Sequence, residues 1–293
     1  AIIRALGDSK TPVYFLILSS LLNIALDLLF IVQIGTGTAG AAYATVISQA
    51  VSGILCLIYM KKKFEILHMH HEETRISGRH IYILCKMGVP MGLQYSITAI
   101  GSVVIQTAIN SLGSIAVASV TAGQKIGMFF CCPFDALGGT MATYAGQNMG
   151  ARQPERVSRG LGQGVLVSLL LTAALCLGQL LGRGLIAGAF KLDEAAAAIC
   201  DQHLLASALA MPIFAIYFPA NGMFQGVGEG FFATFCALLA LGLRVVFAYC
   251  LYQTALFGYT AIWWSQAMAW TAALLTCYTH FFRGKWKEKS LVQ

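Results

Sequence analysis

The sequence contains very little charge. Only 11% of its 293 residues are aspartate, glutamate, lysine or arginine, whereas soluble domains carry about 25%. The apolar fraction is 58% and the mean hydropathy is +0.73. This composition excludes a soluble domain with a large core and predicts an all-α integral membrane protein.

Motifs of catalysis and metal binding are also missing. The apolar segments contain no HExxH motif, no paired acids and no Ser/His set, which argues against an intramembrane enzyme. The sequence also shows no rings of charged residues and no filter loops, which are typical of a channel. The nine cysteines lie mostly inside apolar runs, without the spacing of a disulfide framework or a metal site. We therefore expect no enzymatic activity and no cofactor.

Eight apolar segments are long enough to cross a bilayer. They run near residues 12–34, 39–60, 81–109, 115–145, 157–181, 196–221, 230–254 and 259–282. One longer hydrophilic stretch, residues 61–79, separates the first two segments from the other six. His68, His70 and His71 in this stretch have no second cluster of ligands nearby in the sequence, so we expect a solvated loop rather than a metal site.

The positive charges indicate how the chain is oriented. Fifteen of the nineteen lysines and arginines fall on one side of the eight-span zigzag, and the positive-inside rule places that side in the cytoplasm. We expect a multi-pass protein of the plasma membrane (the cell inner membrane), with the loop at residues 61–80 and the C-terminus in the cytoplasm. This distribution explains the net charge of +7 without a nucleic-acid partner.

The first span carries two polar residues in its interior. Asn23 and Asp27 are four residues apart and so share one helix face. A carboxylate inside a membrane costs about 2.5 kcal/mol or more, so Asp27 requires a partner or a function. Thr45 on the second, antiparallel span can lie at the same depth. The three side chains offer the oxygen ligands that suit Na⁺, and the carboxylate could instead carry H⁺. The alternative is that they only join two helices by hydrogen bonds.

The third and fourth spans hold weaker candidates for contact with a substrate. They are polar or aromatic side chains within apolar segments: Gln94, Tyr95, Gln106, Lys125 and Phe129. Packing in the core or against lipid is the alternative for the aromatic residues, and snorkelling or a structural ion pair is the alternative for Lys125. The glycines at positions 138, 139, 146 and 150 are expected to allow close helix packing.

The chain also contains an internal repeat. RALGDSKTP at 4–12 resembles QGVGEGFFA at 225–233, an offset of 221, and ISQAV at 47–51 resembles WSQAM at 264–268, an offset of 217. Agreement in order, spacing and topology predicts two similar halves related by a pseudo-twofold axis along the membrane normal. The second half has six spans, so we expect this sequence to be a fragment that lacks four spans, on the order of 140 residues, before Ala1.

The repeat predicts an asymmetry as well. At an offset of 221, Asn23 corresponds to Arg244 and Asp27 corresponds to Ala248. The first half therefore has a polar acidic site, whereas the second half has lost it and carries a fixed positive charge instead.

Five motifs in order resemble the multidrug and toxic compound extrusion (MATE) family over essentially the whole chain. They are RALGDSKTP, LNIALD, GAAYATVISQ, KMGVP and, at 146–157, GQNMGARQPERV. The resemblance implies eight transmembrane helices of a 12-helix, two-lobe fold shaped as an inverted V. Residues 1–63 would be the last two helices of the N-terminal lobe, 64–85 the cytoplasmic inter-lobe linker, and 86–293 the six-helix C-terminal lobe.

The resemblance also implies a function. The family comprises Na⁺- or H⁺-coupled antiporters that export drugs or toxic organic compounds by alternating access. We expect a monomer surrounded by membrane lipid, with small cationic or amphipathic substrates. A flippase of lipid-linked precursors, from the same superfamily, is the alternative.

In several family members the coupling ion binds to an acid on the first helix, to Asn and Asp four apart on the fifth, and to Thr on the sixth. Asn23, Asp27 and Thr45 match the last three, and the first-helix acid lies outside this sequence. Other members use acids on the seventh and tenth helices. Here Thr98 lies near the first of these positions, and Asp201 lies only near the outer end of the tenth helix. A second ion site in the C-terminal lobe is therefore not expected.

Overall fold

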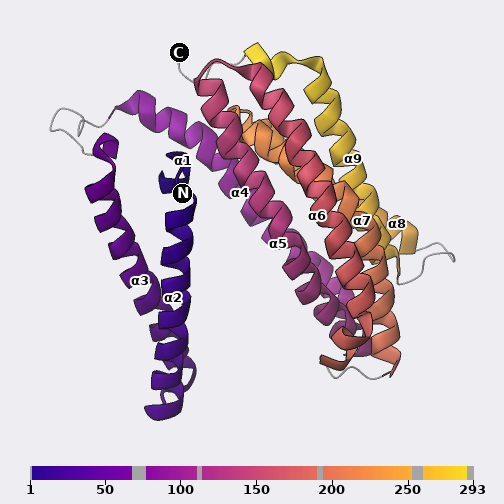
Figure 1. Ribbon diagram of the computed structural model, residues 1–293. Helices are drawn as coiled ribbons and strands as arrows, with labels where there is room; N and C mark the ends of the chain where they lie inside the picture. Colours follow the sequence, from indigo (N-terminus) through magenta and orange to yellow (C-terminus); the bar gives the residue numbers. More distant parts are fainter. Residues whose placement is uncertain (1, 68–76, 111–113, 190–193, 253–259, 289–293) are drawn as a thin grey trace. The chain divides into compact units, whose positions relative to one another are not determined.

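A computed structural model describes residues 2–67, 77–110, 114–189, 194–252 and 260–288, and in these parts every regular element is a helix (Figure 1). His68, His70 and His71 lie outside the described residues. The chain forms two compact units, the N-terminal unit (Ala1–Gly78) and the C-terminal unit (Arg79–Gln293). The finer division at residues 63 and 85 stays a prediction.

The N-terminal unit is an antiparallel helix pair (Figure 1). Its elements are α1 (Ile2–Ala5), α2 (Lys10–Asp27), the π-helix η1 (Leu28–Gln33), α3 (Gly37–Lys63) and the 3₁₀ helix η2 (Glu65–Leu67). Ser52 Oγ on α3 donates to the Phe15 carbonyl oxygen on α2 at 3.0 Å. The rings of Phe15 and Tyr59 meet edge to face at 5.8 Å. These contacts hold α2 and α3 together.

Very few side chains are buried in this helix pair. None of the residues of α2 is buried, and α3 buries only Gly40, Ala44 and Ser48, which are all small. Small residues let two helix backbones approach closely, which is how helices associate in lipid. Most of the apolar surface of α2 and α3 is thus left to face lipid or other helices.

The C-terminal unit is a bundle of six long helices among the described residues. They are α4 (Gly78–Asn110), α5 (Ser114–Gly150), α6 (Pro154–Ala189), α7 (Glu194–Gly226), α8 (Gly230–Tyr252) and α9 (Ala261–Arg283), followed by the 3₁₀ helix η4 (Lys285–Glu288). Helix α7 packs against α5, α6, α8 and α9. Its side chains Tyr217, Met223 and Phe224 are almost fully buried, so α7 forms the centre of the bundle.

Two glycines on α7 allow the closest helix contact of this bundle. A Cβ atom at Gly222 would lie 2.0 Å from the Gly138 carbonyl oxygen on α5, and one at Gly226 would lie 2.2 Å from the Ala142 carbonyl oxygen. No side chain fits at those distances, because the clash would be with backbone. The contact between α5 and α7 therefore depends on glycine at both positions.

The expectation that glycines of α5 permit close packing is partly confirmed. A Cβ atom at Gly138 would lie 3.1 Å from the Phe218 carbonyl oxygen, and one at Gly146 would lie 3.4 Å from the Gly226 carbonyl oxygen. Gly139 and Gly150 do not serve this purpose among the described residues, because a Cβ atom at either position would meet nothing within 4 Å.

The eight predicted apolar segments correspond to eight long helices in the described residues, α2 with η1 and α3 to α9. Five of these are apolar enough, by length and composition, to cross a membrane unaided: Lys10–Gln33, Gly37–Lys63, Pro154–Gly182, Ala196–Gly226 and Gly230–Leu251. Helices α4, α5 and α9 contribute polar side chains to one cavity, described below.

Candidate functional site

The two sequence repeats fold into the same turn. Gly7 and Gly228, 221 residues apart, both adopt positive φ angles, +89° and +85°. The next residue in each case, Asp8 or Glu229, donates its backbone N–H to the carbonyl five residues earlier, at 3.2 Å and 2.8 Å respectively. This is the hydrogen bond of a Schellman helix end, which calls for a glycine in the left-handed conformation. The offset of 221 is thus confirmed at the backbone.

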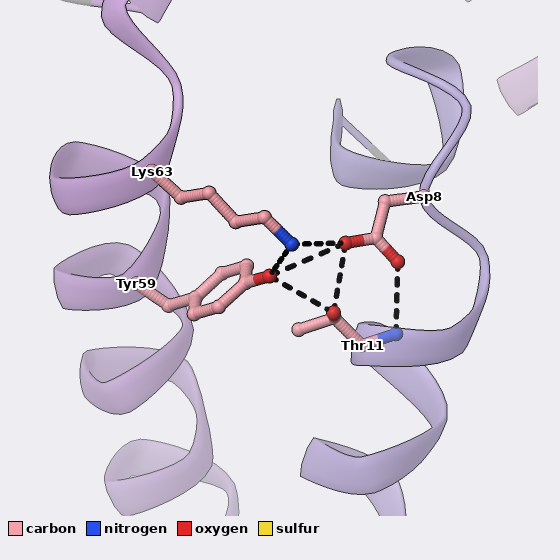
Figure 2. A network of polar contacts seen from close by, with 4 residues as sticks. All are labelled: Asp8, Thr11, Tyr59 and Lys63. Carbon is pink, nitrogen blue, oxygen red and sulfur yellow. Dashed lines mark hydrogen bonds and ion pairs between the residues drawn. The ribbon is translucent and has the colours of Figure 1, made fainter.

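Asp8 lies at the centre of a polar cluster in the N-terminal unit (Figure 2). Thr11 donates its backbone N–H to Asp8 Oδ1 at 3.0 Å and its hydroxyl to Oδ2 at 2.8 Å. The Tyr59 hydroxyl donates to Oδ2 at 3.3 Å, and Lys63 Nζ lies 3.4 Å from the same oxygen and also bonds to Tyr59. The backbone N–H of Thr11 first, and then its hydroxyl and Lys63, lower the pKa of Asp8 to about 2.

The C-terminal unit repeats this anchor with different residues. Glu229 Oε2 lies 2.7 Å from His280 Nε2, and the ring of Phe232 stacks on His280 at 4.0 Å. The acid and its ring partner are 51 residues apart in both units. The Glu229 side chain is 4% exposed, against 20% for Asp8, so the second anchor is the more deeply buried. No sequence motif marks Tyr59 or His280 as the partner of the acid. Their common separation of 51 residues from the acid is nevertheless present in the sequence.

The predicted ion site lies farther along the same two helices as the Asp8 cluster. Asn23 Nδ2 on α2 donates to Thr45 Oγ1 on α3 at 3.4 Å, and Thr45 Oγ1 donates to the Ala41 carbonyl oxygen at 2.9 Å. Asp27 lies one turn beyond Asn23, and its Oδ1 is buried without a hydrogen-bond partner in the part of the chain that the structure describes. Helix α2 ends at Asp27 and continues as the π-helix η1. Turns of π-helix occur frequently at functional sites.

A cavity of about 720 Å³ opens within the C-terminal unit. Its polar lining comes from five helices: Thr98, Ser102 and Gln106 on α4, Gln124 on α5, His203 and Ser207 on α7, Arg244 on α8, and Gln266 on α9. Its apolar walls include Met128, Met211, Phe214 and Trp263. The cavity therefore combines aromatic and flexible apolar surface with hydrogen-bonding groups and one permanent positive charge.

A family model described as MatE matches residues 90–250, which is more than half of the chain. The chain belongs to the MatE family. Within the curated proteins, a Bacillus subtilis (strain 168) relative named "Probable multidrug resistance protein YpnP" is 30% identical over 99% of this chain and 64% of its own length. A Staphylococcus haemolyticus (strain JCSC1435) relative named "Multidrug export protein MepA" is 24% identical over 92% of this chain and 59% of its own length. The chain thus spans less than two thirds of either relative.

The fold agrees with a solved structure of the same kind. The structure titled "Outward-facing conformation of a multidrug resistance MATE family transporter of the MOP superfamily" superposes with a TM-score of 0.90 at 21% identity. The superposition covers 98% of this chain and 65% of that one. The predicted fold class, eight membrane helices of the two-lobe MATE architecture, is confirmed.

In this MatE chain the predicted polar residues fall into two groups. Gln106 lines the cavity and donates its amide to Asn110 Oδ1 at 3.0 Å. Gln94, Tyr95, Lys125 and Phe129 are not among the lining residues. Tyr95 is 74% exposed and Phe129 is 73% exposed, so the described helices of this unit cover neither side chain. Contact of these four residues with a substrate stays a prediction.

Two prominent cavity residues were not candidates for substrate contact. Arg244 was marked by the repeat only as a charge in the position of Asn23, and His203 stood alone in its span. In the structure the two side chains line one cavity, and the His203 ring meets Trp263 edge to face at 5.4 Å. They come from α7 and α8, which are neighbours in the sequence, but only the packing of the bundle brings both side chains to this cavity.

Proposed function

We propose that the complete protein is a Na⁺- or H⁺-coupled antiporter that exports drugs or toxic organic compounds across the plasma membrane. The basic helix ends lie in the cytoplasm in this proposal. Family membership and the printed names of the two relatives, multidrug resistance and multidrug export, support the exporter function. The coupling ion binds at Asn23, Asp27 and Thr45 in the N-terminal unit.

The observation that carries this proposal is Oδ1 of Asp27. This buried oxygen has no hydrogen-bond partner among the described residues, although buried polar atoms in proteins are almost always bonded. A proton or Na⁺ would satisfy that oxygen. The Asn23 amide nitrogen already donates to Thr45, which leaves the amide oxygen to face an ion. Carboxylate, amide and hydroxyl oxygens are suitable ligands for a hard cation such as Na⁺.

Coupling then requires that the ion bind one conformation more tightly than the other. A ligand shifts a conformational equilibrium only by its differential affinity for the two states. A proton or Na⁺ on Asp27 removes the charge from the membrane interior, which is otherwise costly. Loss of the ion on the other side restores that charge, and the cycle can proceed with substrate.

The test is dye efflux from vesicles that contain the complete natural protein, under an imposed Na⁺ or H⁺ gradient. Asp27→Asn keeps the size and hydrogen bonding of the side chain but removes the charge. We expect coupled efflux to fall at least about tenfold, equivalent to roughly 1.4 kcal/mol. Asn23→Ala and Thr45→Ala should reduce efflux less, because each removes only a neutral ligand. Comparison of the two gradients identifies the coupling ion.

Glu65→Gln is the matched control, because it removes a carboxylate that is exposed on η2, outside the helix pair. It should leave efflux unchanged. If Asn23, Asp27 and Thr45 only join two helices, Asp27→Asn would lower the melting temperature while the surviving protein kept full coupling. Normal gradient-driven efflux by Asp27→Asn would therefore refute the ion site.

A further inference from the structure

The cavity of the C-terminal unit has a positive lining. Arg244 lines it and carries a positive charge at neutral pH. His203, which also lines it, is neutral or positive but never negative. The described residues that line the cavity include no aspartate and no glutamate. A cationic compound in this cavity would meet a like charge, whereas an anion would meet an opposite one.

Arg244 Nε and His203 Nδ1 are buried atoms of this lining that have no hydrogen-bond partner among the described residues. A charge removed from water needs a counter-charge or hydrogen bonds, because its desolvation costs several kcal/mol. The described residues that line the cavity supply no counter-charge. A ligand carboxylate or phosphate would accept from Arg244, and a planar carboxylate matches the fork of a guanidinium.

The rest of the lining suits the body of an organic molecule. Trp263 and Phe214 offer aromatic surface, and Met128 and Met211 are adaptable apolar side chains. The amides of Gln124 and Gln266 can bond to polar substituents. The volume of about 720 Å³ falls within the range of roughly 300–1,000 Å³ that is typical of sites for drug-sized ligands.

The repeat explains where this charge comes from. Arg244 corresponds, at the offset of 221, to Asn23. The position that carries a neutral amide in the N-terminal unit thus carries a guanidinium in the C-terminal unit. Ala248 stands where the N-terminal unit has Asp27, so no acid offsets that charge.

We infer that the cavity formed by α4, α5, α7, α8 and α9 is a binding site for amphipathic organic anions, which are flat aromatic compounds bearing a carboxylate or phosphate. Arg244 is the residue that pairs with the anionic group. The inference rests on the proposed exporter function for its physiological meaning, since it names a substrate class for that exporter. The site itself can be tested without any transport.

The test uses two dyes that share a xanthene scaffold and differ in charge, anionic fluorescein and cationic rhodamine 123. Binding to the purified complete protein in uncharged lipid nanodiscs is followed by fluorescence anisotropy at neutral pH, with no ion gradient. We expect saturable binding of fluorescein that is at least about tenfold tighter than binding of rhodamine 123. Arg244→Gln should weaken fluorescein binding about tenfold or more and remove the discrimination.

Arg244→Lys keeps the charge and should keep most of the preference for fluorescein, which separates charge from folding. Arg159→Gln is the matched control, because it removes an exposed arginine on α6 that does not line the cavity. Circular dichroism and melting temperature establish that each variant is folded. Tighter binding of rhodamine 123 by the unaltered chain, no saturable fluorescein binding, or unchanged fluorescein binding by Arg244→Gln would each overturn the inference.

Competition distinguishes two sources of such an anion. Displacement of fluorescein by farnesyl pyrophosphate, but not by farnesol, would extend the site to anionic lipid headgroups. Displacement by salicylate alone would restrict it to free organic anions. If the unaltered complete protein shows no gradient-driven efflux but still binds fluorescein, the antiporter proposal is refuted and the anion site is not. The two proposals therefore fail independently.

Discussion

The N-terminal and C-terminal units are built on one plan but carry opposite chemistry. Both place an acid directly after a left-handed glycine and join it to a ring 51 residues later. Inside the membrane the plans diverge, because Asn23 and Asp27 on α2 are replaced by Arg244 and Ala248 on α8. Both units thus have a helix-end anchor of an acid and a ring, although its residues differ, whereas the polar residues between those ends differ in charge.

The units also differ in how they are packed. Helix α2 buries no side chain, whereas α7 packs against four helices and brings Gly222 and Gly226 against backbone atoms of α5. Two helices can bury little apolar surface against each other, whereas a bundle of six helices has a central helix that is surrounded by the others. The same kind of sequence, apolar with scattered glycines, therefore tolerates substitution very differently in the two units.

The sharpest test of this comparison transfers the N-terminal chemistry into α8. Arg244→Asn with Ala248→Asp copies the Asn23 and Asp27 pair onto one face of α8, four residues apart. We expect the dye preference to invert, so that rhodamine 123 binds more tightly than fluorescein, with a change in the affinity ratio on the order of 100-fold. Anisotropy titrations in nanodiscs measure it.

The single variant Arg244→Asn is the control for this exchange. It removes the guanidinium without adding an acid, so it should abolish discrimination without inverting it. A double variant that is folded and still prefers fluorescein would show that the charge at these two positions does not select the ligand.

A smaller effect should separate the two units in stability. Gly222→Ala places a methyl group 2.0 Å from a backbone oxygen of α5, and we expect a loss of roughly 1–3 kcal/mol or more. Gly53→Ala on α3 meets nothing within 4 Å and should be neutral or stabilising by up to about 1 kcal/mol, because alanine favours helix. Thermal unfolding of the purified chain in detergent measures both. Equal melting temperatures for the two variants would contradict the packing difference.

The smallest effect concerns the anchor at Asp8. Its pKa is lowered from 3.8 to about 2 in the folded chain, so its contribution to stability is present above pH 4 and is lost as the pH falls toward 2. Asp8→Asn should lower the melting temperature slightly at neutral pH, and the difference from the unaltered chain should vanish near pH 2. Melting curves at several pH values measure this. A difference that stays constant with pH would show that the carboxylate charge plays no part.

Several features followed from the sequence because they depend on local pattern. The lengths of the apolar runs predict the positions of the helices. The similarity between RALGD and GVGEG indicates that the two segments, each with a glycine followed by an acid, correspond to one another. The short loop makes the first two helices antiparallel neighbours, and the sequence predicts that Thr45 lies at the depth of Asp27. In the structure Thr45 bonds to Asn23, which is one helical turn from Asp27. The repeat marked Arg244 as a charge in the position of Asn23.

Other features could not be obtained in this way. Tyr95 and Phe129 lie on helix faces that are exposed in this unit, which their residue types do not reveal, and their contact with a substrate stays a prediction. Gly139 and Gly150 are as small as Gly138, yet a Cβ atom at either position would meet no described residue within 4 Å. The type of a residue and its spacing from other residues do not determine the direction in which its side chain faces. That direction depends on how each helix is rotated about its axis relative to its neighbours.

The sequence by itself determined the membrane location, the eight helices, the family and the repeat, because each of these depends on the composition or order of residues along a single segment. Only the tertiary structure decided that Arg244, His203 and Gln106 line one cavity and that α7 lies at the centre of its bundle. The physical reason is that helix packing in lipid depends on the shape of contacting surfaces, where one Cβ atom is enough to forbid an approach. That shape exists only after the helices are assembled.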